Sequence, residues 1–438
     1  MNSKEKNIWE IAARYRNFVL SENITRATIR TVFSKYLVDN YLYASTKEEM
    51  MLYADAQKAT ASLDAMAFIE TLQPIMQMID IKLQTAPLLS DIPYQIRDDI
   101  LGSSGKKYRG LDDPSDRFMQ ILRNMDFTEN EENLYDALAD FIYSSAEKGS
   151  RRGADSVTNR SLVSLAAKLL DAGKTDTYLD FACGYGLSSF EIIKDEEIGA
   201  VLTDANQENV QIALILSIIK QRKTQAVHIV VADPLAADKF GSFSRIFVDF
   251  PLGARIDREV YGTSDGNLLA IKRVIESLGQ DGRAVVTCPS GLLFKESKEV
   301  MEFRKELVDQ KLIEAVVSLP ALMYGSTVNV NILILSKKNN TDVVMVDASS
   351  NSCWQFSNNV RSRNTELTEE GISKIVEIIH NHEEIEGVSK TVEGKVLLEK
   401  NTFVPASFID VPKKKQMLSS TEIQDRLSEL YNKLQEQR

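Results

Sequence analysis

Residues 177–193 contain the feature that most constrains the fold of this 438-residue chain. A short apolar run ends at Asp180, a Gly-x-Gly turn follows at Gly184 and Gly186, and a helical apolar pattern begins at Leu187. A strand that stops at two glycines and continues as a helix brings bare backbone and free N–H groups close to a ligand. The segment therefore predicts a ligand-binding strand–turn–helix unit, although a Gly-x-Gly turn alone is weak evidence.

Predicted strands and helices alternate from residue 158 onwards. We expect strands at 177–182, 200–203, 227–232, 245–249, 283–288, 312–319 and 329–336, and helices at 161–170, 187–194, 207–220, 266–278 and 298–310. Such alternation indicates a parallel sheet covered by helices on both faces. The last two strands have no helix between them, so we expect an antiparallel pair at the sheet edge. A strand over 343–346 and a helix over 368–380 follow.

Residues 1–147 are predicted to form a separate, all-helical domain. Six segments are predicted to be helices from their apolar patterns, and the last of them precedes the sheet domain: 8–15, 29–36, 48–60, 65–81, 116–122 and 131–145. Asn23 or Thr25 could cap the second helix. The charged, glycine-bearing segment 148–153 is either the domain boundary or a loop over the ligand.

The sheet domain is predicted to cover 148–340, with 341–415 as its C-terminal part, and a helix over 416–438 ends the chain. Ser419 and Glu422 stand at capping-box spacing. Apolar residues then recur at steps of four and three: Ile423, Leu427, Leu430 and Leu434. This seam is shorter than the roughly 3–4 heptads of a coiled coil, so it fits a helix that packs on its own domain as well as one that docks on a partner.

Composition narrows the function classes. A hydrophobic content of 43% with 26% charged residues is ordinary for a globular protein, and no apolar run approaches membrane-spanning length, so we expect a cytoplasmic protein without a membrane partner. Cys183, Cys288 and Cys353 lack paired spacing, which argues against a zinc site. A protein that binds duplex DNA alone normally has a basic face, whereas this chain has a net charge of −11. If it acts on DNA, a partner would supply most of the contacts with the DNA phosphates.

Acidic residues end three further predicted strands. Asp204 lies about twenty positions after the glycines, where a carboxylate can accept hydrogen bonds from ribose hydroxyls. Asp233 ends the third strand and Asp249 the fourth. Simpler interpretations stay open, because Asp233 could belong to a plain turn and Asp249 could cap one. We interpret Cys183 as a small packed residue and not as a nucleophile.

From about residue 153 to residue 409 the chain resembles the modification subunit of type I restriction–modification systems, an adenine-N6 DNA methylase family. The matches occur in the family's order, at 153–158, 180–186, 282–286, 289–294, 319–324, 329–335 and 401–409. The resemblance implies an α/β, class I, Rossmann-like fold that uses S-adenosyl-L-methionine (AdoMet), with a helical N-terminal domain and a C-terminal helical extension.

The resemblance also implies a cofactor site and a catalytic site. AdoMet would be bound by the loop before the first helix, the glycine turn and the ends of the second and third strands: Thr158, Asp180, Ala182, Gly184, Gly186, Asp204, Ala205, Asp233, Pro234 and Leu235. The target amine would be held by the tetrapeptide Asp249, Phe250, Pro251 and Leu252, with the Asp249 side chain and the Phe250 carbonyl as acceptors. No metal site is implied.

This tetrapeptide departs from the family's Asn/Asp-Pro-Pro-aromatic pattern. Phe250 replaces the proline that stiffens the turn, and Leu252 replaces the ring that stacks on a flipped base. Base–aromatic stacking is worth roughly 1–3 kcal/mol. Tyr185 replaces a small residue in the glycine turn and either lines the pocket or partly fills it.

Three functions follow from these observations. We favour an AdoMet-dependent adenine-N6 methyltransferase subunit that acts on double-stranded DNA with a separate specificity subunit, contacted by the terminal helix, and with a restriction subunit as a further companion. The second is an impaired methyltransferase-like subunit that binds AdoMet and assembles or regulates a DNA-defence complex, as Tyr185, Phe250 and Leu252 favour. The third, a methyltransferase for RNA or protein amines, is disfavoured by the helical N-terminal domain.

Overall fold

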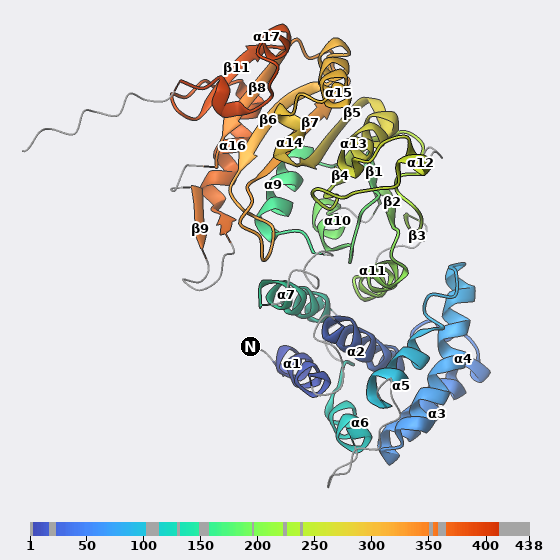
Figure 1. The fold of residues 1–438 in the computed structure, drawn as a ribbon. Coiled ribbons are helices and arrows are strands. Elements are labelled where there is room, and N and C mark those ends of the chain that lie inside the picture. The colour runs from blue at the N-terminus through green and yellow to red at the C-terminus, as the bar shows by residue number, and fades with distance from the viewer. Residues whose placement is uncertain are drawn as a thin grey trace, which may run out of the picture.

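The computed structural model describes residues 3–16, 23–101, 114–128, 132–148, 157–194, 197–221, 226–236, 240–349, 354–357 and 365–410. A layer of helices at the N-terminal end faces an α/β part that contains the sheet (Figure 1). Residues 149–153 of the predicted boundary, Cys353 and the predicted helix over 416–438 lie outside the described residues. None of the described helices is both long and apolar enough to cross a membrane.

The predicted N-terminal helices are confirmed, and one more is present. They are α1 (Ser3–Tyr15), α2 (Ile24–Asn40), α3 (Lys47–Ser62), α4 (Ala65–Leu83), α5 (Ile92–Leu101), α6 (Pro114–Asn124) and α7 (Glu132–Lys148). Helix α5 was not predicted. Asn23 occupies the cap position of α2, but its side chain makes no capping hydrogen bond. Helix α2 is buried along most of its length because α1, α3, α5 and α7 pack around it.

The described strands of the α/β part form one large sheet in the order β11-β8-β6-β7-β5-β4-β1-β2-β3. Their bounds are β1 (Thr177–Asp180), β2 (Gly199–Asp204), β3 (Val227–Val231), β4 (Phe243–Val248), β5 (Leu278–Cys288), β6 (Ile313–Leu319), β7 (Val330–Ser336), β8 (Asp342–Asp347) and β11 (Ser389–Glu393). Strands β1 to β5 pair in parallel, and β7 is antiparallel to β5 and β6. The expected Rossmann-like sheet of six parallel strands, β1 to β6, with β7 reversed is confirmed, and β11 is a second reversed strand that was not expected.

The expectation that the predicted strands over 312–319 and 329–336 form the sheet edge is wrong. Strands β6 and β7 do pair antiparallel, but β8 pairs in parallel with β6, and β11 pairs antiparallel with β8. The sheet therefore continues beyond β6. Strand β11 follows helix α16 (Glu369–Asn381) after a short connection. Its mixed polar sequence did not indicate a strand. A separate two-stranded ladder joins β9 (Gln355–Ser357) to β10 (Thr365–Leu367).

Helices cover both faces of the sheet. The longer ones are α9 (Arg160–Leu170), α11 (Gln207–Ile219), α13 (Gly266–Ser277), α15 (Lys298–Asp309) and α16, and the shorter ones are α10 (Leu187–Ile192), α12 (Arg258–Tyr261), α14 (Ser290–Phe294), α17 (Gly394–Glu399) and the 3-10 turn η2 (Pro405–Ser407). One apolar cluster packs α13 and α15 on the sheet. The other runs from the sheet through α9, α10 and α11 into the helical domain.

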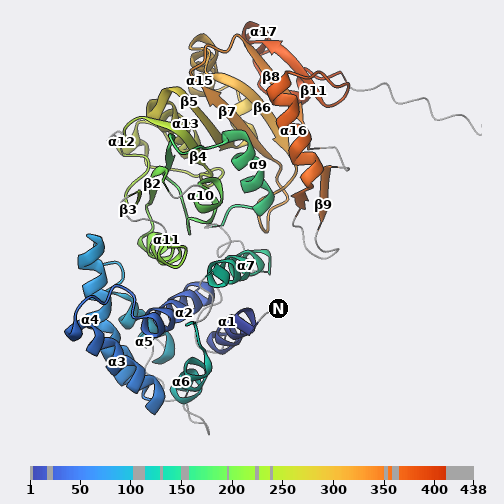
Figure 2. The same cartoon turned by 180° about the vertical axis from the view of Figure 1, so that it is seen from behind.

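The two parts of the molecule meet through helix α11. It contacts α2 and α7, and both views place it between the sheet and the N-terminal helices (Figures 1 and 2). Tyr135 of α7 also packs edge-on against Phe190 of α10, with ring centroids 6.3 Å apart. The helical domain therefore lies against the elements that follow β1 and β2, where the glycine turn and Asp204 are found.

Candidate cofactor and catalytic site

The first strand ends in a turn built around Asp180. This residue is 1% exposed, and its carboxylate accepts hydrogen bonds from the Ser189 hydroxyl (2.8 Å) and from the Ala182 N–H (3.1 Å). Burial raises the pKa of Asp180 to about 7, although both hydrogen bonds oppose the shift. Asp180 therefore ties the turn to helix α10, and it does not line the adjoining cavity.

The two glycines of the turn adopt left-handed backbone conformations, with φ of 55° at Gly184 and 78° at Gly186. A Cβ atom at Gly186 would stand 2.9 Å from Cε2 of Phe190, so no other residue fits there without displacement. The Gly184 N–H donates a hydrogen bond of 3.0 Å to Oδ2 of Asp204. The turn after β1 is thus fastened to the end of β2.

Asp204 faces the cavity and is held rigidly. Its Oδ1 accepts hydrogen bonds from the Asn206 N–H (2.8 Å) and from Nδ2 of Asn209 (3.3 Å). A carboxylate has about four acceptor positions, and three are used here, so one stays available for a ligand hydroxyl. The neighbouring Ala205 is exposed and is not among the residues that line the cavity.

Asp249 directly follows β4, and its two carboxylate oxygens differ in environment. Oδ2 accepts a hydrogen bond of 2.8 Å from the Thr158 hydroxyl, whereas Oδ1 is buried without a partner among the described residues. Burial raises the pKa of Asp249, and the Thr158 hydroxyl opposes the shift, as does the nearby Thr287 hydroxyl, which is itself buried without a hydrogen-bond partner among the described residues. A buried acceptor without a donor is costly unless a ligand supplies one. Oδ1 is therefore a candidate acceptor for a substrate N–H.

The tetrapeptide after β4 is stiffened by a residue that the sequence did not point to. Asn267, 1% exposed on α13, accepts a hydrogen bond of 2.7 Å from the Gly253 N–H and donates one of 3.1 Å to the Pro251 carbonyl. Pro251 lines the cavity, Phe250 is buried in the α13 cluster, and Leu252 is partly buried. Asn267 thus fixes the turn in which Phe250 replaces the family's first proline.

Asp233, the acidic residue after β3, lies away from the glycine turn, Asp204 and Asp249. Asp233 is exposed at the end of β3, where it accepts hydrogen bonds from the Tyr261 hydroxyl (2.6 Å) and from the Leu235 N–H (2.9 Å). Pro234 and Leu235 are buried beside it. These three residues are not among those that line the cavity.

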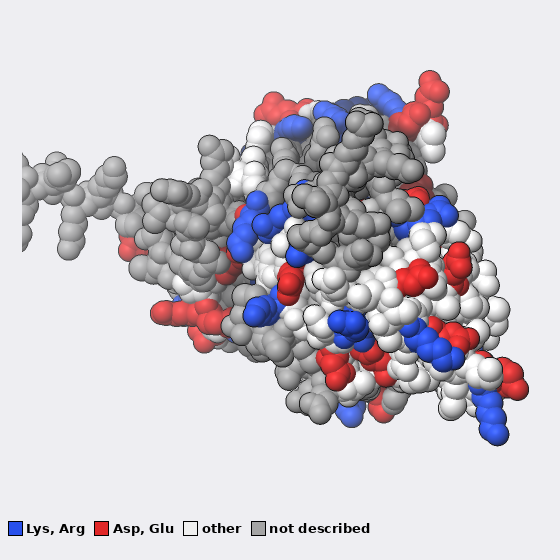
Figure 3. Space-filling model, turned by 90° about the horizontal axis from the view of Figure 1, so that it is seen from below, with Lys and Arg blue, Asp and Glu red and all other residues white. Residues whose placement is uncertain are grey.

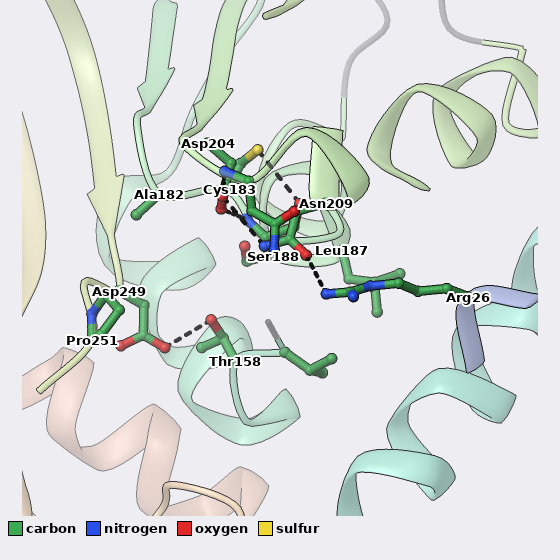
Figure 4. Close-up of a pocket in the computed structure, with 13 residues that line it drawn as sticks. Arg26, Thr158, Ala182, Cys183, Leu187, Ser188, Asp204, Asn209, Asp249 and Pro251 are labelled. Atoms are coloured by element: carbon green, nitrogen blue, oxygen red, sulfur yellow. Dashed lines mark hydrogen bonds between the residues drawn. The ribbon is translucent and has the colours of Figure 1, made fainter. Parts of the chain in front are cut away.

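The cavity has a volume of about 330 Å³ and lies between the glycine turn, Asp204 and Asp249 (Figure 4). Small-molecule sites have volumes of roughly 300–1,000 Å³. Six of the predicted site residues line it: Thr158, Ala182, Gly184, Asp204, Asp249 and Pro251. Sequence reasoning missed seven others as lining residues: Arg26, Val157, Cys183, Leu187, Ser188, Asn206 and Asn209. Burial holds the pKa of the Cys183 thiol well above its usual range, so the thiol stays neutral.

Arg26 enters the cavity from the helical domain, on the side opposite Asp249 (Figure 4). Its guanidinium donates to the Tyr185 hydroxyl (3.1 Å), to Glu208 (2.5 Å) and to Oδ1 of Asn209 (3.1 Å). Tyr185 is 3% exposed and is not among the residues that line the cavity. The Tyr185 substitution therefore provides a contact for the helical domain. No local sequence pattern could reveal the contact between Arg26 and Tyr185, because the two residues are 159 positions apart.

The described surface on the side of the helical domain bears charges of both signs. Lysine and arginine side chains alternate with aspartate and glutamate over the part of this face that is described (Figure 3). A protein that binds duplex DNA alone normally presents a basic face. The mixed surface agrees with the net charge of −11.

Comparison with known proteins identifies relatives. The N-6 DNA methylase family matches residues 131–406. The methylase subunit of the type I restriction enzyme MpnII of Mycoplasma pneumoniae is 25% identical over 322 residues, which are 64% of this chain and 58% of the relative. The corresponding MjaVII subunit of Methanocaldococcus jannaschii is 25% identical over 316 residues, 64% of this chain and 53% of the relative. The aligned part thus spans little more than half of each relative's length.

Solved structures share the fold along nearly the whole chain. The methyltransferase subunit of a type I restriction–modification system from Streptococcus thermophilus has a TM-score of 0.75 at 17% identity, covering 92% of this chain and 98% of that one. A chain from a structural study of type I system assembly and conformational transition has a TM-score of 0.66 at 13% identity, covering 99% and 96%. At these identities the likeness shows the fold alone.

Proposed function

Because this chain belongs to the N-6 DNA methylase family, we propose that it is the methyltransferase subunit of a type I restriction–modification-like system and methylates N6 of adenine in double-stranded DNA. One observation carries the proposal. Asp249, whose buried Oδ1 has no hydrogen-bond partner among the described residues, lines the same cavity as the Gly184 turn and Asp204. An acceptor for an amine and a small-molecule site are thereby joined in one space.

The lining of this cavity suits AdoMet, which supplies a methyl group already activated on a positively charged sulfonium. Gly184 leaves room for the methionine part, and the spare acceptor position of Asp204 suits a ribose hydroxyl. The two carboxylates favour a cationic ligand. Asp180 and Gly186 would act by shaping the turn. Contacts of the adenine ring with Asp233, Pro234 and Leu235 stay a prediction.

Asp249 would act on the target amine and not on the cofactor. The exocyclic nitrogen of adenine is a poor nucleophile because its lone pair is conjugated with the ring. Oδ1 of Asp249 and the Phe250 carbonyl would each accept one amine hydrogen, which turns the lone pair out of conjugation and towards the methyl group. Positioning the nitrogen about 3–3.5 Å from that carbon supplies much of the rate enhancement. The base must leave the helix to reach this site.

Sequence recognition would come from a partner. The net charge of −11 and the mixed surface charge favour a specificity subunit that supplies base contacts and most phosphate contacts. We propose that the terminal helix over 416–438 contacts this subunit and that a restriction subunit is a further companion. The relatives are named as subunits of type I restriction enzymes, which supports such an assembly.

Transfer of tritiated methyl groups from AdoMet to unmethylated genomic DNA tests the proposal. The chain co-purified with its specificity subunit should label the DNA, and the chain alone should label it at least about tenfold more slowly, since a partner supplies most phosphate contacts. Labelling of RNA or protein in preference to DNA would contradict the proposed substrate. Equal labelling of DNA by the isolated chain would contradict the need for a partner.

A further inference from the structure

The cavity carries one cationic side chain among its described lining residues, and that side chain belongs to the helical domain. We propose that Arg26 binds the carboxylate of the methionine part of AdoMet, so that the helical domain completes the cofactor site. This inference rests on the proposed function and deepens it, because it assigns a cofactor contact outside the methyltransferase domain.

The geometry leaves Arg26 free to take a ligand. A guanidinium has five N–H groups in a planar fork. Three of them are used, by the Tyr185 hydroxyl, Glu208 and Asn209. The side chain is 15% exposed, and it borders the cavity next to the glycine turn, whose middle residue is Tyr185. Two N–H groups therefore remain for a planar carboxylate, the ligand that an arginine fork matches best.

Charge complementarity also assigns the carboxylate to this end of the cavity. AdoMet carries two positive groups, the sulfonium and the ammonium, and one negative group, the carboxylate. The carboxylates of Asp204 and Asp249, which also line the cavity, would repel a carboxylate placed beside them. A carboxylate that leaves water needs a cation or several N–H donors. Arg26 can meet this need without losing its existing partners, because its spare N–H groups lie on a fork that is already fixed.

Arg26 differs in this respect from its neighbour Arg30, one turn later on α2. Arg30 has a side chain that is 4% exposed, binds Gln211 (2.7 Å) and Glu208 (3.1 Å), and does not line the cavity. Both arginines join the helical domain to α11, but of the two only Arg26 lines the cavity. Arg30 is therefore a matched control, which separates the docking of the domains from contact with the cofactor.

Isothermal titration with two ligands tests the inference on the full chain. AdoMet carries the carboxylate, and decarboxylated AdoMet keeps the sulfonium and the amine but lacks it. Arg26→Met should weaken AdoMet binding about ten- to a hundredfold, as expected for a charge-assisted hydrogen bond, and should change the binding of the decarboxylated ligand by less than about threefold. Arg26→Lys keeps the charge but loses the fork, so its selective loss should be smaller.

Arg30→Met should change the affinities for the two ligands by the same factor. Melting temperatures without ligand show whether each variant is folded. If Arg26→Met is not folded, Arg26→Lys takes its place in the comparison of the two ligands. Equal weakening of both ligands by the Arg26 variants, or no weakening at all, would overturn the carboxylate contact while leaving the proposed function intact. Failure of the unchanged protein to bind either ligand would overturn both.

Discussion

The Thr158 hydroxyl donates a hydrogen bond of 2.8 Å to Oδ2 of Asp249 across 91 positions of sequence. It joins the segment before α9 to the end of β4. The bond occupies one carboxylate oxygen and leaves the buried Oδ1 without a partner among the residues that the structure describes. The orientation of the proposed amine acceptor therefore depends on Thr158, which lines the proposed cofactor cavity.

Thr158→Val should slow methyl transfer about tenfold, because the isosteric side chain cannot donate and a hydrogen bond to a charged group is worth about 1.5–3 kcal/mol. Thr158→Ser keeps the hydroxyl and should restore most of the rate. Single-turnover rates of the complex with the specificity subunit measure the effect. A Val variant as fast as the unchanged protein would mean that Asp249 is oriented without Thr158.

The acid limb of the pH–rate profile should lie above the ordinary carboxylate range. Burial raises the pKa of Asp249 from 3.8, and protonation would fall on Oδ1 because Oδ2 already accepts from Thr158. The free acceptor would then become a donor, so activity should be present above the raised pKa and lost as the pH falls through it. Asp249→Asn keeps an acceptor oxygen without a proton to gain, so its profile should lack this limb. An unchanged limb in the Asn variant would assign the titration to another group.

Gly186→Ala should destabilise the protein by about 1–2 kcal/mol and abolish AdoMet binding, because an L-residue is strained at φ 78° and the new Cβ would meet Phe190. Gly199→Ala is the matched control, since a Cβ there meets nothing within 4 Å. Urea midpoints and calorimetric titration compare the two variants. Equal, small effects at both positions would show that the turn relaxes without cost.

Aspartate at both Leu427 and Leu430 should abolish assembly with the specificity subunit and leave the isolated chain folded and able to bind AdoMet. The two positions lie on the apolar seam that we propose as the contact. Size-exclusion chromatography of the mixed subunits measures assembly, with melting and AdoMet titration as controls. A lower melting temperature of the isolated chain would instead identify the helix as an internal support.

The parts of this molecule that sequence patterns predicted are those governed by local rules. The alternation of strands and helices, the glycine turn and the acids at strand ends follow from hydrophobic periodicity and backbone sterics, and they led to Asp204 and Asp249. Strand β11 escaped prediction because its pairing with β8 is a long-range choice that its short polar sequence does not encode.

The missed site residues have a common physical cause. Arg26 and Asn267 act through contacts with segments distant in sequence, Tyr185 in one case and the turn at Pro251 and Gly253 in the other. Neither residue carries a motif of its own. The Tyr185 substitution in the glycine turn was a visible signal, but only the docked helical domain shows that its partner is Arg26.

The most direct test of the account is to identify the methylated product. The complex of this chain with its specificity subunit is incubated with AdoMet and unmethylated DNA, and the nucleosides are analysed by mass spectrometry. The account predicts N6-methyladenine with the unchanged chain and none above background with Asp249→Ala, although that variant should still bind AdoMet. Absence of N6-methyladenine from a complex that binds both AdoMet and DNA would contradict the account.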